Sequence, residues 1–433
     1  MISRLFDFLE ESPVSFHAIA AMEKRLKAAG YRKLDAADRM SGIAPGSRIY
    51  VTKNDTSLFA FHIGSRPLAE TGIRLICAHS DSPTFRIKPQ PEILGAGRLC
   101  KLNVEVYGGA ILSTWMDRPL GIAGRVVVRT ADPMKPESRL MHIRRPLLTI
   151  PSLCIHFNRQ VNSGVALSVQ KDMQPILGYI ENELSADRYL IGLVSREIGV
   201  DADDILDFDL YLYSTEKPCC FGAHDEFISA SRLDDLSMVH AGLESLLASD
   251  GDAVFTRAFA VFDNEETGSG TKQGAGSPFF ASVVKRLILA TGGDDEDYYC
   301  TVERSFMISA DNAHAYHPNY SEKYDPVCRP ILGAGPAIKY NAAQKYASDA
   351  WSASVFEGLC RAAGVQCQRF VNHSDVAGGS TLGNILTGSF PVAGVDMGNP
   401  ILAMHSVRET GSVSDHVQCF KAFAKFYGGG DGV

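Results

Sequence analysis

The sequence predicts an α/β fold, with a mixed, largely parallel sheet flanked by helices and a β-rich domain inserted into it. The first observation is that apolar runs typical of buried strands alternate with amphipathic helical patterns, both before about residue 90 and after about residue 224. The second is that residues 91–223 carry short strand patterns separated by proline and glycine, with less helical periodicity. We therefore predict a discontinuous domain of residues 1–90 and 224–433, interrupted by an inserted domain of residues 91–223.

The first predicted element is a helix that begins near Ser12 and ends at Gly30. Ser12 is a suitable N-cap, and Pro13 suits the first helical position because the missing N–H has no acceptor there. Apolar residues recur at helical spacing on one face: Phe16, Ile19, Met22 and Leu26. Two later helices are predicted on the same grounds, over 236–246 and 283–288.

Apolar segments of strand length are expected to form the main sheet. They are residues 48–53, 57–64, 73–79, 258–263, 305–311 and 391–398. Because helical patterns separate the later segments, these strands are expected to run largely parallel. In the inserted region, residues 101–107 and 124–130 are the clearest strands.

Composition excludes several classes of protein. With 45% hydrophobic and 21% charged residues, the chain is ordinary for a globular protein that buries a sizeable core. With a net charge of -8 and no run of basic residues, the sequence has no positively charged segment of the kind that binds nucleic acid. No apolar run approaches the ~18 residues that cross a membrane, and acidic residues interrupt the first 13 residues where a signal peptide would be apolar. We expect a cytoplasmic protein with no membrane or nucleic-acid partner.

The ten cysteines favour neither a thiolate zinc site nor a disulfide framework. No CxxC pair occurs, and several cysteines lie inside apolar runs, as small buried hydrophobic residues do. The vicinal pair Cys219 and Cys220 is the candidate for redox chemistry, as a minor alternative to an inert role.

Two glutamates, Glu265 and Glu266, follow the predicted strand 258–263 directly. Taken alone, such a pair is more typical of a solvated loop or the first turn of a helix. On an extended chain, however, adjacent side chains point to opposite sides, so the two acids could have different roles at one site.

Other metal-ligand types stand at comparable places. His79 and Asp311 each close a predicted strand, His405 follows 391–398, and Asp234 lies where a loop enters a helix. Each alone is more typical of hydrogen-bonded structure than of a ligand. In open α/β sheets, however, ligands collect at the carboxyl ends of the strands. Two histidines with three carboxylates form the ligand set of a two-zinc hydrolytic site.

Asp81 follows His79 at a spacing of two and lies on the same face of an extended chain. It can therefore accept the second imidazole N–H of a metal-bound His79. The alternative, equally weighted on these residues alone, is that Asp81 begins a turn ahead of Pro83.

The motifs AHSDSP, VEVYGGAILSTWMDRPLGIAGRV, RLDDL, DNEETGS, SADNAHAYHPNY, GPAIKYNAAQKYAS and LAMHSVRE occur in this order along nearly the whole chain. With them the sequence closely resembles the aspartyl aminopeptidase family of di-zinc exopeptidases, most of all its bacterial members. The resemblance implies a di-zinc exopeptidase catalytic domain and an inserted domain that mediates dimerisation and larger assembly.

The resemblance also implies a role for each candidate ligand. His79 and Asp311 would bind one zinc, Glu266 and His405 the other, and Asp234 would bridge them, while Glu265 would be the general base. The family often has Asn after the bridging aspartate, whereas this chain has Asp235, which leaves open which carboxylate bridges. Co²⁺ or Mn²⁺ could also occupy such nitrogen and oxygen donors.

Five further residues are implied to contact substrate: His156, His314, His317, Lys339 and Tyr346. In the family, a histidine at the place of His156 reaches the active site of a neighbouring subunit of a closed, dimer-based dodecamer. Lys339 with the histidines would form a cationic pocket for an acidic N-terminal side chain.

The leading functional prediction is a zinc-dependent aminopeptidase that removes N-terminal Asp or Glu from peptides. One alternative is a di-zinc aminopeptidase of neutral specificity or an N-acyl-amino-acid hydrolase, which the pocket around Lys339 would distinguish. A remote alternative is a catalytically silent assembly protein, which loss of the base or of the ligands would favour. The full ligand set is present, so an enzyme is expected.

Overall fold

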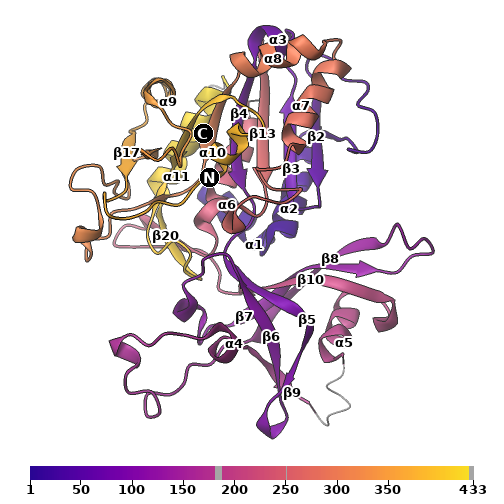
Figure 1. The fold of residues 1–433 in the computed structure, drawn as a ribbon, viewed down its shortest axis with the longest axis vertical. Helices are drawn as coiled ribbons and strands as arrows, with labels where there is room; N and C mark the ends of the chain where they lie inside the picture. Colours follow the sequence, from indigo (N-terminus) through magenta and orange to yellow (C-terminus); the bar gives the residue numbers. More distant parts are fainter. Residues whose placement is uncertain (181–187, 250, 429–433) are drawn as a thin grey trace. The chain divides into compact units, whose positions relative to one another are not determined.

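A computed structural model describes residues 1–180, 188–249 and 251–428, drawn in Figure 1. By its internal contacts the chain divides into unit 1 (Met1–Asp81, Pro218–Met404 and Glu409–Val433) and unit 2 (Ser82–Lys217 and His405–Arg408). Unit 2 begins several residues before the predicted boundary at 91, because the long strand β5 (Thr84–Leu94) pairs with other strands of unit 2. It ends before residue 223 because β11 (Cys219–Phe221) pairs with β12 (Phe227–Ala230) of unit 1.

Unit 1 is built on a nine-stranded sheet of order β1-β2-β3-β13-β4-β14-β18-β16-β17. Its central strands β13, β4, β14 and β18 are mutually parallel, whereas β2, β3 and β16 introduce antiparallel pairs. The predicted mixed, largely parallel sheet is therefore confirmed. The strands are β1 (Arg32–Lys33), β2 (Arg48–Lys53), β3 (Ser57–His62), β4 (Ile73–His79), β13 (Thr256–Phe262), β14 (Phe306–Ala310), β16 (Ala337–Tyr340), β17 (Gln368–Val371) and β18 (Ala393–Gly398).

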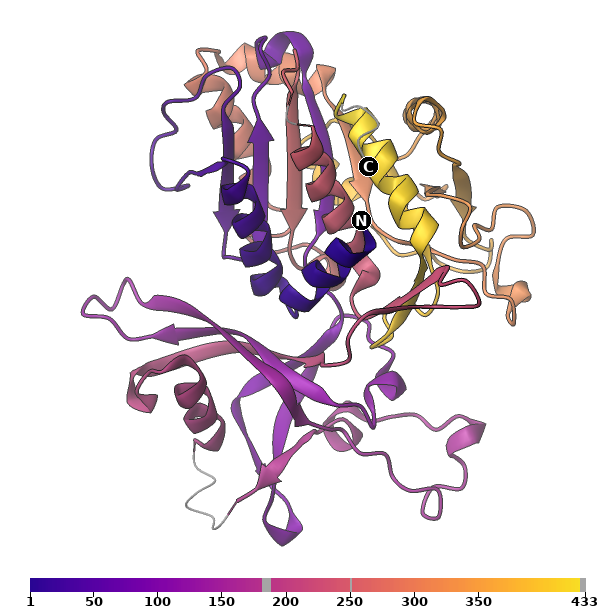
Figure 2. The same ribbon diagram turned by 180° about the vertical axis from the view of Figure 1, so that it is seen from behind.

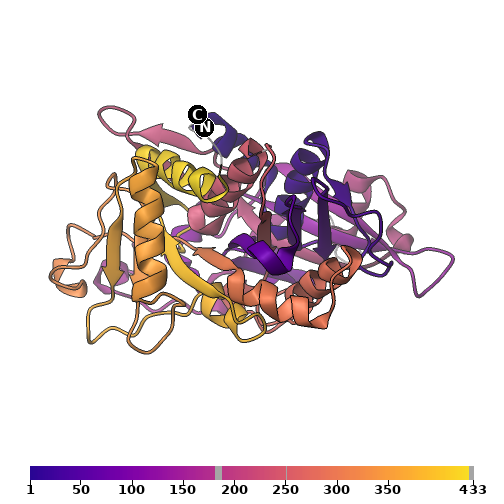
Figure 3. The ribbon, with the colours of Figure 1, turned by 90° about the horizontal axis from the view of Figure 1, so that it is seen from above.

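Helices cover both faces of this sheet. On β4, Ile76 and Ala78 pack on one face with α1, α2, α6, α9 and α11, while Leu75 and Cys77 pack on the other with α7, α8 and α10. Strands buried on both faces read as continuous apolar runs. Figures 1 and 2 show the two helical layers from opposite sides, and Figure 3 shows them edge-on. The helices are α1 (Ile2–Glu11), α2 (Ser15–Ala28), α3 (Leu68–Thr71), α6 (Leu233–Ala248), α7 (Phe279–Ala290), α8 (Asp295–Arg304), α9 (Ala350–Ala362), α10 (Leu382–Thr387) and α11 (Val413–Phe426).

The start of the chain differs from the prediction. Ser12 is the C-cap of α1, and the N-cap of α2 is Val14, so the predicted capping role of Ser12 is wrong. The reason is that α1 buries Leu5, Phe8 and Leu9, a second helical stripe that precedes the one detected. Pro13 then separates the helices, because proline lacks an N–H and disfavours helical backbone in the residue before it.

Unit 2 is antiparallel and rich in β-structure. Its six-stranded sheet has the order β8-β7-β10-β5-β6-β9. The predicted strand 101–107 lies within β6, and the predicted strand 124–130 overlaps β7, which ends at Val128. A separate core of unit 2 contains Phe85, Trp115 and Phe208. Besides β5, the elements are β6 (Leu99–Tyr107), β7 (Leu120–Val128), β8 (Glu137–Leu148), α4 (Val169–Asp172), β9 (Ile176–Tyr179), α5 (Tyr189–Ile198) and β10 (Ile205–Ser214).

Two small sheets complete unit 1. In one, β12 pairs with both β11 and β20 (Glu409–Ser412). In the other, β15 (Ala313–His314) pairs with β19 (Pro400–Ile401). Within the described ranges, every helix is too short or too polar to cross a membrane.

Candidate metal centre

The carboxyl ends of three neighbouring strands carry the candidate ligands of unit 1. His79 ends β4, Asp311 follows β14, and Glu265 and Glu266 lie in a short 3-10 turn after β13. Because β4 is parallel to both β13 and β14, with Phe262 opposite His79, these strand ends fall at one edge of the sheet. Asp234 reaches the same place from the first turn of α6.

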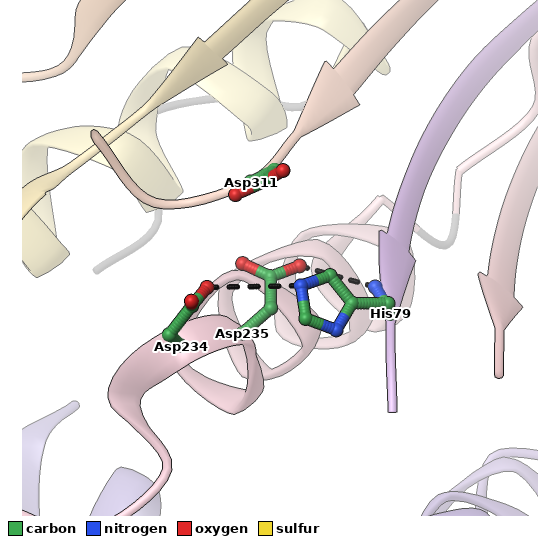
Figure 4. A group of neighbouring side chains, drawn as sticks. All are labelled: His79, Asp234, Asp235 and Asp311. Atoms are coloured by element: carbon green, nitrogen blue, oxygen red, sulfur yellow. Dashed lines mark hydrogen bonds and ion pairs between the residues drawn. The ribbon is translucent and has the colours of Figure 1, made fainter. Parts of the chain in front are cut away.

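The donor atoms of these residues converge in two overlapping groups. His79, Asp234, Asp235 and Asp311 each offer one donor atom within 4.8 Å of the others, and Figure 4 shows these side chains. His79 forms a second such group with Glu265 and Glu266. A zinc ion sits roughly 2.0–2.2 Å from nitrogen and oxygen ligands, so the spacing is close to that of a metal site. One imidazole among carboxylates is a donor set that fits zinc.

The His79 side chain is buried and held on two sides. Its Nε2 lies 3.7 Å from Asp234 Oδ1, and its backbone N–H donates to Asp235 Oδ2 at 3.1 Å. The Nδ1 atom lies 3.0 Å from the backbone carbonyl of Asp81 and 3.4 Å from its carboxylate. The nearer partner on this side is therefore the carbonyl oxygen rather than the predicted carboxylate.

The Asp81 carboxylate instead accepts hydrogen bonds from the turn that carries Glu265 and Glu266. Its two oxygens accept the backbone N–H groups of Glu265 and Glu266, each at 3.1 Å. Asp81 is buried, so this pair of hydrogen bonds fixes the position of the turn.

The structure separates the positions of Asp234 and Asp235, which the sequence left open. Asp235 is fully buried and bonds the His79 backbone, whereas the Asp234 carboxylate faces the imidazole Nε2 (Figure 4). The peptide bond between these two residues is cis. Asp234 is therefore placed on the side of His79 that a metal would occupy.

The electrostatics of the group favour a bound cation. Although burial opposes it, the carboxylates of Asp235, Asp234 and Asp81 raise the pKa of His79 well above its usual value. Burial, with Asp311 and Glu266 nearby, raises the pKa of Glu265 to about 9. Carboxylates this close repel one another in the ionised form, and a divalent cation among them would relieve that repulsion.

Lys339 and Tyr346 lie beside the same group. Lys339, near the end of β16, is only 4% exposed, and its Nζ lies 3.1 Å from Asp311 Oδ1 and 5.7 Å from the ring centroid of Tyr346. Burial alone would lower the pKa of Lys339, but the Asp311 carboxylate raises it, so the ammonium stays charged. A buried cation therefore adjoins the candidate ligands.

Within unit 1, the ring contacts of His314 and His317 are with aromatic residues outside this group. The ring of His314 packs 5.7 Å from Phe370, and that of His317 packs 4.8 Å from Tyr320. His156 lies exposed in unit 2. His405 also belongs to unit 2, where its Nδ1 lies 3.1 Å from the carbonyl oxygen of Gly109. Their roles beside residues of unit 1 stay predictions.

Sequence reasoning missed Glu409. This residue begins β20, is buried, and its Oε2 accepts the backbone N–H of Asp234 at 3.0 Å. The only available signal was its place in the motif LAMHSVRE, which does not distinguish a supporting carboxylate from a surface one.

A helix-covered mixed sheet whose strand ends carry a histidine among carboxylates has the architecture of a metal-dependent hydrolase. The family model described as "Aminopeptidase I zinc metalloprotease (M18)" matches residues 8–427. The chain belongs to this M18 family of zinc aminopeptidases, which confirms the resemblance seen in its motifs.

Relatives with full-length similarity bear the same family name. "Probable M18 family aminopeptidase 2" of Clostridium acetobutylicum is 47% identical over 424 residues, covering 98% of each chain. The protein of the same name from Pseudomonas aeruginosa is 43% identical over 425 residues, covering 98% of this chain and 97% of the relative.

Solved structures of the same family share the fold. The chain in "Cryo-EM structure of the Ape4 and Nbr1 complex" superposes with a TM-score of 0.94 at 34% identity, covering 98% of this chain and 85% of that one. "Structure of S. cerevesiae mApe1 dodecamer" gives a TM-score of 0.86 at 25% identity, covering 98% and 96%.

Proposed function

We propose that this zinc aminopeptidase prefers peptides with an N-terminal Asp or Glu. The observation that carries the proposal is the buried ammonium of Lys339 beside the candidate ligands. An ammonium has three N–H donors, so the contact with Asp311 leaves donors for a second carboxylate. Tyr346 borders the same ammonium, and His314 and His317 are proposed to approach the substrate as well.

The proposed centre holds two zinc ions. His79 and Asp311 would bind one, Glu266 and His405 the other, with Asp234 between them; Co²⁺ or Mn²⁺ could replace zinc. When bound, such ions supply polarisation of the scissile carbonyl and acidification of a water molecule.

Glu265 is proposed as the general base. Its carboxylate lies in the same group as His79 and Glu266, on the turn that Asp81 fixes through two hydrogen bonds. A cation nearby favours the ionised form of a carboxylate, in which Glu265 can accept a proton from water and return it to the leaving amine. Asp81 acts here as a positioning residue.

Unit 2 is proposed to mediate assembly, as predicted for the inserted domain 91–223. An exposed apolar segment supports this: Leu153, Ile155, Phe157, Val161 and Val165, with Phe157 81% exposed. His156 lies within this segment and is proposed to complete a neighbouring subunit's site. The dodecamer of the related mApe1 supports the same assembly here. The proposal includes a cytoplasmic location, with which the ten free cysteines agree.

The test is hydrolysis of aminoacyl p-nitroanilides by chelator-treated and zinc-restored protein, with Asp and Glu compared with Leu, Ala and Lys. We expect zinc-dependent release from Asp and Glu above all others. Equal or faster release from Leu would refute the acidic preference. Failure with every anilide, followed by cleavage of N-acyl amino acids, would favour the acylase alternative. Failure with both would favour the silent assembly protein.

A further inference from the structure

A concave region of unit 1, apart from the candidate metal centre, is lined by three cysteines. The cavity, of about 720 Å³, lies between the end of α9, the start of β17 and residues 327–330. Cys328, Cys360 and Cys367 all line it, and none of them belongs to the candidate metal centre. Figures 1 and 3 show α9 and β17 side by side.

Two of these cysteines, Cys360 and Cys367, flank the tight turn between α9 and β17. Cys360 lies in the last turn of α9 and Cys367 directly precedes β17. Hydrogen bonds from Val365 N to Cys360 O at 2.8 Å and from Gly364 N to Arg361 O at 3.2 Å turn the chain back. Cys367 packs against the core cluster that contains Cys360, and both line the same cavity. The Cys367 side chain, together with burial, raises the pKa of Cys360.

The two thiols differ in access. Cys360 is 1% exposed, whereas Cys367 is half-buried at the cavity wall. A small oxidant therefore meets Cys367 first, and Cys360 is placed behind it as the second thiol. This is the arrangement of an attacked cysteine with an adjacent resolving cysteine.

The cavity is also cationic. Arg329, Arg361 and Arg369 line it, and these guanidinium groups attract anions to the cavity. Glu357 offsets one of these charges, because its carboxylate accepts from Arg369 Nε at 3.0 Å.

Several other cysteines differ from this pair in access or in placement. Cys77, Cys100 and Cys419 are buried, and Cys154 is exposed. Cys219 and Cys220, the pair singled out from the sequence, are adjacent on β11, so their side chains point to opposite faces of the strand.

We propose that Cys360 and Cys367 form a hydroperoxide-sensitive dithiol that closes to a reversible disulfide. The Cys367 thiolate attacks one peroxide oxygen, the O–O bond breaks, and the leaving oxygen takes a proton as water or alcohol. Cys367 becomes a sulfenic acid. The Cys360 sulfur then displaces the sulfenic oxygen, which leaves as water with the Cys360 proton, and the S–S bond forms. Two thiols and one hydroperoxide thus give one disulfide and two molecules of water, or water and alcohol.

The sequence allows a direct test by mass mapping. Trypsin cuts after Arg361, which places Cys360 in peptide 346–361 and Cys367 in peptide 362–369. Reduced full-length protein is treated with graded hydrogen peroxide, quenched with N-ethylmaleimide and digested without reductant. We expect these two peptides to become joined, with the loss of two maleimide adducts, and dithiothreitol to reverse both changes.

Variants separate the two steps. Cys360→Ser should abolish the joined peptide and leave Cys367 as a sulfenic acid that dimedone traps, while Cys300→Ser should leave the joining unchanged. A bond between Cys328 and Cys367, or unjoined peptides at peroxide doses that oxidise exposed Cys154, would overturn the proposal. The mapping of the wild-type protein decides the question even if a variant fails to fold.

Discussion

The replacement of Lys339 by methionine tests the proposed acidic specificity. Lys339→Met keeps most of the side-chain length but removes the buried ammonium that lies 3.1 Å from Asp311. If this ammonium also receives the substrate carboxylate, the variant loses one charge-assisted hydrogen bond in the complex with Asp or Glu. It loses no such bond with a neutral residue such as Leu.

The size of the effect follows from the burial of Lys339, which is only 4% exposed. A hydrogen bond to a charged group contributes about 1.5–3 kcal/mol. Because 1.4 kcal/mol corresponds to a factor of ten, the ratio of kcat/KM for Asp over Leu should fall roughly 10- to 150-fold.

The assay compares Asp and Leu p-nitroanilides for wild type, Lys339→Met and the control Lys345→Met, which removes an exposed lysine of the same region. Zinc content is measured for each protein, because the loss of Lys339 also changes the partner of Asp311. An unchanged Asp to Leu ratio in Lys339→Met, at unchanged zinc content, would refute the specificity argument.

Three further outcomes are expected. Glu265→Gln should lower kcat by about 10²- to 10⁴-fold with zinc content unchanged, and full activity would exclude Glu265 as the base. Glu409→Ala should lower kcat/KM or zinc affinity by about 10- to 100-fold. Glu409→Gln should lose less, because its amide oxygen still accepts the Asp234 N–H. Equal losses in the two variants would contradict a role of Glu409 in positioning Asp234. Burial lowers the pKa of His416 to about 3 in the folded protein, whereas a histidine of the unfolded chain has a pKa of about 6.5. The unfolded chain therefore binds a proton at this residue first, and the free energy of unfolding falls as pH drops below about 6.5. His416→Asn should therefore lose about 2 kcal/mol less than wild type between pH 7 and pH 5 in urea unfolding, and parallel losses would argue against a neutral buried His416.

The sequence predicted the parts of the site that parallel strands organise. His79, Asp311 and Glu265 follow apolar runs, and the carboxyl ends of parallel strands meet at one edge, so their convergence follows from topology. The same reasoning could not place His314, because β15 is a two-residue strand that pairs with β19 outside the main sheet and is too short to be detected in the sequence. It could not detect α1 either. Ser12 and Pro13 were interpreted as the start of a helix, whereas Ser12 ends α1.

The Lys339 contact with Asp311 lay beyond prediction for a different reason. The two residues come from β16 and from the end of β14, with β18 between these strands in the sheet. Their pairing therefore depends on strand order, which a single sequence does not specify. Only the family resemblance indicated that Lys339 belongs near the site.

A set of supporting carboxylates shows where sequence reasoning ends. Asp81, Asp235 and Glu409 are all buried, and each accepts the backbone N–H of a candidate ligand or base. Every residue except proline has a backbone N–H, so such a partnership leaves no pattern in the sequence.

The same carboxylates explain why the site can be both rigid and strongly negative. Each fixes a ligand-bearing segment at its backbone, which leaves the side-chain donor of that segment available to a metal. Although burial lowers the pKa of His79, the carboxylates of Asp235 and Asp81 contribute to raising it. An amide at these positions would keep part of the positioning but not the charge. For one supporting carboxylate, the further loss from the amide variant to the alanine variant therefore measures the geometric part of its effect. The loss from wild type to the amide variant measures the electrostatic part.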